Sequence, residues 1–107
     1  MRHEVERHHF TSGKPYRNPE AVVALPLWAH VETHRLLGRA GLESGPPSLR
    51  VAFQEQLWAL WLEGEELAGT TLTLCLGTTS TGRKVSLTVG PKGLRFLADR
   101  AERWYRE

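Results

Sequence analysis

The sequence predicts a small α+β protein, and three observations support this fold class. The chain has 107 residues, 40% of them apolar and 24% charged, which fits a soluble globular protein with one modest core. Several short runs alternate apolar with polar residues, as half-buried strands do. Other segments repeat apolar residues every three or four positions, as one face of a helix does. Together these periods predict strand, strand, helix, then helix, hairpin and a final helix.

The first forty residues are expected to form a strand, a loop, a second strand and a helix. A short strand is expected within residues 4–13, which end in turn-forming Thr, Ser and Gly. Residues 21–25 are a compact apolar run of strand length. A helix begins at Leu27 and ends at Gly38 or Gly41. Its apolar stripe is expected to comprise Trp28, Val31, Leu36 and Leu37.

A second helix is expected after the Gly/Ser/Pro-rich connector at residues 42–47. Ser48 is a candidate N-cap, and Gly64 is expected to end the helix. The expected apolar face comprises Leu49, Phe53, Leu57, Leu60 and Trp61. We also expect Trp58 and Trp104 to be core or interface residues.

The last third of the chain predicts a β-hairpin and a terminal helix. Residues 70–76 and 84–89 alternate apolar and polar side chains, and a polar loop bounded by Gly77 and Gly82 joins them. Cys75 is expected to be a small, half-buried strand residue. The helix after Gly90 is expected to pack across the hairpin through Leu94, Leu97, Ala101 and Trp104.

Composition excludes several classes of protein and favours a cytoplasmic location. The N-terminus is too polar for a signal peptide, and no apolar run approaches the ~20 residues of a membrane-spanning helix. A single cysteine, Cys75, permits no internal disulfide. The formal net charge of +2 is too small to indicate nucleic-acid binding by itself.

Histidines are the strongest anomaly of the composition. All five lie in the first 34 residues, namely His3, His8, His9, His30 and His34. His30 and His34 are four residues apart on a predicted helix, so their rings project from one face, as two ligands of a divalent cation do. His8 and His9 point to opposite sides of a strand, so only one of them can join that ion. The alternative is that surface histidines fell at this spacing by chance.

Two stretches of the sequence, taken together, resemble a known nuclease motif. The first is Glu6-Arg7-His8-His9-Phe10, and the second is Asn18-Pro19-Glu20-Ala21-Val22-Val23-Ala24-Leu25-Pro26-Leu27-Trp28-Ala29-His30-Val31-Glu32-Thr33-His34. They resemble the HNH nuclease motif of the ββα-metal fold, and are most similar to its His-rich version in nuclease colicins and small phage HNH proteins. The resemblance covers residues 4–40, and its likeness to phage proteins is compatible with a phage-encoded chain.

The resemblance implies a division of roles among the polar residues of this segment. His8, His30 and His34 would hold one divalent metal ion, and His9 would be the general base. Glu6 matches a carboxylate that supports an arginine at the site. Residues 4–40 would then be an HNH-like ββα-metal nuclease unit. Residues 41–107 would complete the core, within the same domain or as a small appended subdomain.

Two departures from the family pattern concern an asparagine and a zinc staple. The family asparagine position is occupied by Ala21, and Asn18, three residues away, is the candidate to brace the loop instead. Many HNH proteins also carry Cys-x-x-Cys pairs, but Pro26 and Ala29 stand at the corresponding positions here. The core must therefore hold the domain without zinc between cysteines.

The function that the resemblance implies is metal-dependent, one-ion hydrolysis of phosphodiester bonds, with double-stranded DNA as partner and no membrane. Three histidines form a permissive ligand set, so Mg²⁺, Mn²⁺, Ni²⁺ or Zn²⁺ could occupy it. Candidates for phosphate contacts are Arg7, Lys14, Arg17, Arg35 and Arg39. The first alternative is a degenerate HNH module that binds metal or DNA without cleaving it. The second is a small interaction protein whose tryptophans dock a partner and whose histidines are incidental.

Overall fold

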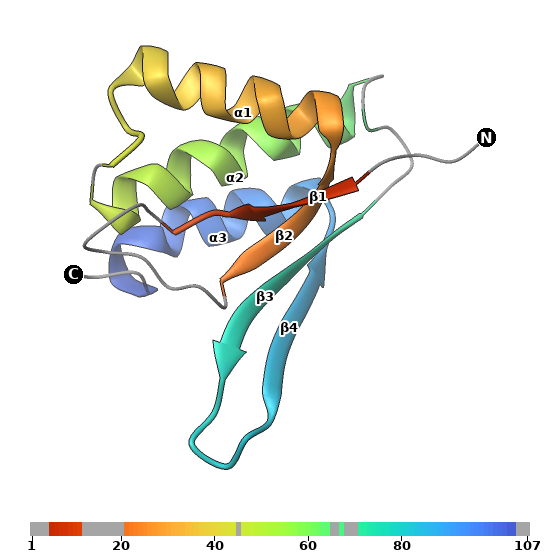
Figure 1. Ribbon diagram of the computed structural model, residues 1–107, viewed down its shortest axis with the longest axis vertical. Helices are drawn as coiled ribbons and strands as arrows, with labels where there is room; N and C mark the ends of the chain where they lie inside the picture. Colours follow the sequence, from red (N-terminus) through yellow and green to blue (C-terminus); the bar gives the residue numbers. More distant parts are fainter. Residues whose placement is uncertain (1–4, 12–20, 45, 65–66, 68–70, 105–107) are drawn as a thin grey trace.

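The described part of the chain forms three helices and a four-stranded sheet (Figure 1). The computed structural model describes residues 5–11, 21–44, 46–64, 67 and 71–104, with side chains up to residue 101. In chain order the elements are β1 (Val5–His9), β2 (Val22–Pro26), α1 (Leu27–Ala40), α2 (Pro47–Glu63), β3 (Leu72–Thr78), β4 (Lys84–Val89) and α3 (Pro91–Trp104). This order confirms the predicted α+β class.

The sheet is antiparallel throughout and has the strand order β1-β2-β3-β4. His8 of β1 lies opposite Val23 of β2, and Val22 of β2 lies opposite Cys75 of β3. Strand β2 therefore lies between β1 and the C-terminal β3–β4 hairpin and pairs with both. Residues from the predicted 4–40 and 41–107 segments thus belong to one sheet.

The three helices stack side by side on one face of this sheet, while the β3–β4 hairpin extends beyond them (Figure 1). One core cluster includes Leu25 of β2, Ala29 of α1, Trp58 of α2, Leu74 of β3 and Leu94 of α3. Every helix and both halves of the chain therefore contribute to the same apolar interior. Within the part of the chain that the structure describes, no helix combines the length and apolarity needed to cross a membrane.

The predicted hairpin and terminal helix are confirmed, but α3 packs mainly against α2 rather than across the hairpin. Leu72 pairs with Val89 and Leu74 with Leu87, and a bulge between Cys75 and Gly77 carries β3 on to Thr78, beyond the expected end of that strand. In α3, the side chains of Leu94, Leu97 and Ala101 are buried. The side chain of Trp104 lies outside the described residues.

The predicted apolar stripe of α1 is right at Leu37 and wrong at Trp28 and Val31. The buried residues of α1 are Ala29, Thr33 and Leu37, whereas Trp28 is 42% exposed and Val31 58% exposed. The helix presents Thr33 to the core in place of Val31, and there Thr33 accepts a hydrogen bond from the buried indole N–H of Trp58, at 3.1 Å. The predicted end is right, since Gly41 caps the helix in the left-handed conformation at φ 72°.

The predicted start and apolar face of α2 also need correction. Pro46 is the N-cap and Pro47 the first helical residue, a position that suits proline because its missing N–H is not needed there. Leu49 and Leu60 of the predicted face are each 57% exposed. In their place α2 buries three polar residues, Arg50, Gln54 and Glu55, which hydropathy alone would assign to the surface.

Candidate metal centre

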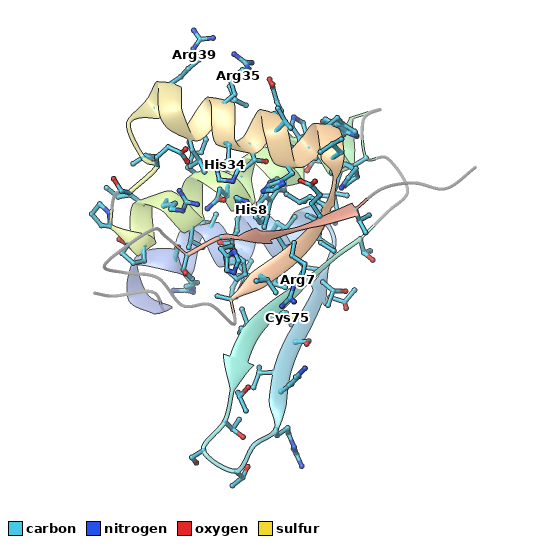
Figure 2. The ribbon with its side chains drawn as sticks, viewed as in Figure 1. Arg7, His8, His34, Arg35, Arg39 and Cys75 are labelled. Carbon is cyan, nitrogen blue, oxygen red and sulfur yellow. The ribbon has the colours of Figure 1, made fainter. Side chains whose placement is uncertain are left out.

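Three histidines from two elements converge at one place in the fold. His8 lies on β1 and His34 on α1 (Figure 2), and His30 lies one turn before His34 on the same helix. Each ring offers one nitrogen, and these three atoms lie within 4.8 Å of one another. The ring centroids of His8 lie 5.2 Å from His30 and 4.9 Å from His34. This is the clustering expected of residues that share one ion.

The local chain path explains why these rings meet. Strand β2 pairs with β1 and ends at Pro26, and α1 begins at the next residue, Leu27. The helix therefore folds back over the strands that precede it, and its first two turns bring His30 and His34 to the buried side of β1. His8 points to that side because strand residues alternate.

The three histidines of the cluster differ in how far solvent reaches them. His8 is completely buried, while the side chains of His30 and His34 are 22% and 44% exposed. Burial lowers the pKa of His8 to about 3, an effect that the hydrogen bond to Gln54 opposes and nearby cationic groups reinforce. His8 is therefore neutral near pH 7, the form that can ligate a metal. His30 and His34 are thus the members of the cluster that solvent reaches.

Each of the three rings has a hydrogen-bond partner behind it. The Nδ1 atom of His30 lies 2.5 Å from Oε1 of Glu6, and Nδ1 of His34 lies 3.2 Å from Oε1 of Glu43. The Nε2 atom of His8 is paired with Oε1 of Gln54. Such contacts orient metal-ligating histidines and leave one nitrogen of each ring for the ion.

The buried polar atoms of the cluster fit a cation. The Nδ1 atom of His8 is buried and has no hydrogen-bond partner among the residues that the structure describes. An unpaired buried polar atom is costly, and a divalent ion would satisfy it. The carboxylates of Glu6 and Glu43, behind His30 and His34, also favour positive charge there.

A buried arginine, Arg50, connects two segments that lie beside the cluster. Arg50 of α2 donates to the backbone oxygens of Glu43 at 2.6 Å and of His9 at 3.1 Å. It also contacts the Glu43 carboxylate at 3.4 Å. Burial lowers the pKa of Arg50, and Glu43 opposes this effect. Arg50 thereby fixes both the end of β1 and the connection between α1 and α2.

The structure brings together four of the predicted site residues, His8, Glu6, His30 and His34. Glu6 contacts His30, whereas the resemblance implied an arginine as its partner. His9 is exposed at the end of β1, on the side of the strand opposite to His8. Ala21, in the place of the family asparagine, is a buried core residue.

The described cations predicted to contact phosphate do not gather at the cluster. Arg35 and Arg39 project from the outer side of α1, away from His34 (Figure 2), and Arg35 is paired with Glu32. Arg7 lies on the other side of the sheet, where it lines a pocket of about 140 Å³ with Cys75 and Lys84. Three further predicted site residues lie outside the described residues, namely Lys14, Arg17 and Asn18.

Sequence reasoning missed Glu43, Arg50 and Gln54, which surround the cluster. The only local signal, which concerns Arg50 and Gln54, is their i, i+4 spacing, which places both polar side chains on one face of α2.

The comparisons with known proteins add no relative to this description. No protein-family model, no curated protein and no solved structure matches the chain.

Proposed function

We propose that the chain is a divalent-metal-dependent endonuclease that hydrolyses DNA phosphodiester bonds, with β1, β2 and α1 as its ββα-metal unit. The observation that supports it best is the convergence of His8, His30 and His34, each with its second ring nitrogen hydrogen-bonded. The resemblance of residues 4–40 to HNH nucleases supports the choice of DNA as substrate.

The proposed roles divide between holding the ion and moving a proton. His8, His30 and His34 would hold the metal, which would supply Lewis-acid stabilisation of charge on the phosphate and on the leaving oxygen. His9 takes a proton from the water whose oxygen attacks phosphorus, as the P–O bond to the 3′ oxygen breaks. A neutral imidazole suits this task because its ordinary pKa lies near neutral pH. Glu6 orients His30 through their hydrogen bond.

The second candidate is a degenerate module of the same fold that binds metal or DNA without cleavage. Two observations favour it. Ala21 is a core residue with no group to brace a catalytic loop, and Arg35 and Arg39 point away from the histidines (Figure 2).

The test combines metal binding with plasmid cleavage by the full chain. We expect calorimetry to detect one divalent ion per chain, and supercoiled plasmid to be nicked or cut with at least one of Mg²⁺, Mn²⁺, Ni²⁺ or Zn²⁺. The matched control is His3→Ala, which removes a histidine outside the proposed ligand set. Metal binding without cleavage by any of the four ions would support the degenerate module. If the chain binds no metal and EDTA leaves its thermal stability unchanged, the histidines are incidental and both candidates fail.

A further inference from the structure

The amide of Gln54 has only one orientation that its surroundings permit. Gln54 is completely buried, and its Nε2 donates to the backbone oxygen of Phe10 at 2.6 Å and to that of Arg50 at 3.0 Å. Both partners are carbonyl oxygens, which only accept hydrogen bonds. A reversed amide would place its oxygen against two other oxygens. The Oε1 atom of Gln54 must therefore face His8.

This fixed amide determines which nitrogen of His8 carries hydrogen. Oε1 of Gln54 has no hydrogen to donate, so the contact with His8 requires a hydrogen on Nε2 of the ring. A neutral imidazole has one N–H, and its other nitrogen then keeps a free lone pair. That nitrogen is Nδ1 of His8, the buried atom without a hydrogen-bond partner among the described residues.

The two helical histidines have the opposite arrangement. In His30 and His34 it is Nδ1 that faces a carboxylate, of Glu6 and Glu43 respectively. Donation from Nδ1 leaves Nε2 as the nitrogen with the lone pair in both rings. The strand histidine and the two helix histidines therefore keep their lone pairs on different ring nitrogens.

We infer that Gln54 is a positioning residue that selects Nδ1 of His8 as a metal ligand, to be combined with Nε2 of His30 and Nε2 of His34. The inference rests on the proposed metal centre and assigns a role in it to α2, outside the HNH-like segment. A glutamate at position 54 could not substitute, because its second oxygen would face the carbonyls of Phe10 and Arg50.

The first test needs no substitution and no metal. Long-range ¹H–¹⁵N spectra of the ¹⁵N-labelled, metal-free chain distinguish protonated from unprotonated ring nitrogens. We expect His8 to carry its hydrogen on Nε2, and ¹¹³Cd²⁺ added afterwards to couple to Nδ1 of His8 and to Nε2 of both helical histidines. A hydrogen on Nδ1 of His8, or cadmium coupling to its Nε2, would overturn the inference.

The second test measures affinity in a matched pair of α2 variants. Gln54→Met keeps the side-chain length and removes the hydrogen bonds, so we expect the Zn²⁺ dissociation constant to rise about 10–100-fold, the usual effect of losing such a partner. The control is Leu62→Ala, which removes a buried core side chain of the same helix and should leave Zn²⁺ affinity unchanged. Equal affinities for Gln54→Met and the unaltered chain would refute the positioning role.

The outcomes separate this inference from the proposed function. A chain that binds Zn²⁺ through the expected nitrogens but cleaves no DNA retains the role of Gln54 and loses the nuclease proposal. A chain that cleaves DNA with His8 bound through Nε2 retains the nuclease and loses the role of Gln54. A chain that binds no metal loses both.

Discussion

Glu55 of α2 makes the stability of this protein depend on pH in a direction that can be measured. Its side chain is completely buried, and neither carboxyl oxygen has a hydrogen-bond partner among the described residues. Burial raises the pKa of Glu55 from 4.5 to about 8. The folded chain therefore keeps a proton that the unfolded chain releases, and folding is favoured below pH 4.5 and progressively less so up to pH 8.

The expected change can be worked out for a window in which His8 contributes little. The pKa of His8 is lowered from 6.5 to about 3, so its effect, a loss of stability as the pH falls, lies mainly below pH 6.5. Between pH 6.5 and pH 8, Glu55 loses its proton when the chain unfolds. As the pH rises across this range, this should lower the free energy of unfolding by about 2 kcal/mol.

Urea unfolding of Glu55→Gln across this window tests the reasoning. The amide does not ionise, so we expect the free energy of unfolding to stay nearly level, and the variant to gain on the unaltered chain as the pH rises. The control is Glu63→Gln on the same helix, since Glu63 is exposed and its pKa is lowered by Arg95. It should reproduce the slope of the unaltered chain. Equal slopes for Glu55→Gln and the unaltered chain would show that Glu55 is ionised in the folded state.

Three further predictions concern the histidines and the core. His30→Ala or His34→Ala should abolish metal binding in calorimetry, because two remaining histidines make a weak site; micromolar affinity in both variants would contradict the ligand set. His9→Ala should keep metal affinity and lower plasmid cleavage by ~10²-fold or more, which is the scale of a lost general base. His8→Ala should instead weaken metal binding, and its cleavage activity should return in part at high metal concentration. The reverse pattern would exchange their roles. Leu97→Ala should destabilise the fold by about 2–5 kcal/mol in urea unfolding, because Leu97 is buried; no loss would make α3 peripheral.

The local elements could be predicted from sequence because their signals are local. Alternation defined the β3–β4 hairpin, and the change of period at Leu27 defined the start of α1. The pairing of β2 with β3 gave no such signal, since Val22 and Cys75 are distant in the chain and meet only through tertiary packing. The spacing of His30 and His34 indicated a shared site directly.

The surroundings of the site were unpredictable for a different reason. Gln54 and Arg50 are buried because specific carbonyl and imidazole groups satisfy them, and those partners come from β1 and from the connector before α2. A hydropathy pattern assigns such residues to solvent, since burial of a polar group is favourable only with its partners present. For the same reason the hydropathy pattern mispredicted the buried face of α1, where Thr33 is buried and hydrogen-bonded to Trp58.

The pairing of His8 with Gln54 has a consequence for the order of events during biosynthesis. A ribosome releases the N-terminus first, so all five histidines emerge before α2 exists. His8 cannot be oriented until Gln54, 46 positions later, has emerged and docked. Closing so long a loop is slow compared with forming the helices themselves. Before that point His8 lacks the partner that orients it, so the complete cluster forms only once the second half of the chain has folded onto the first.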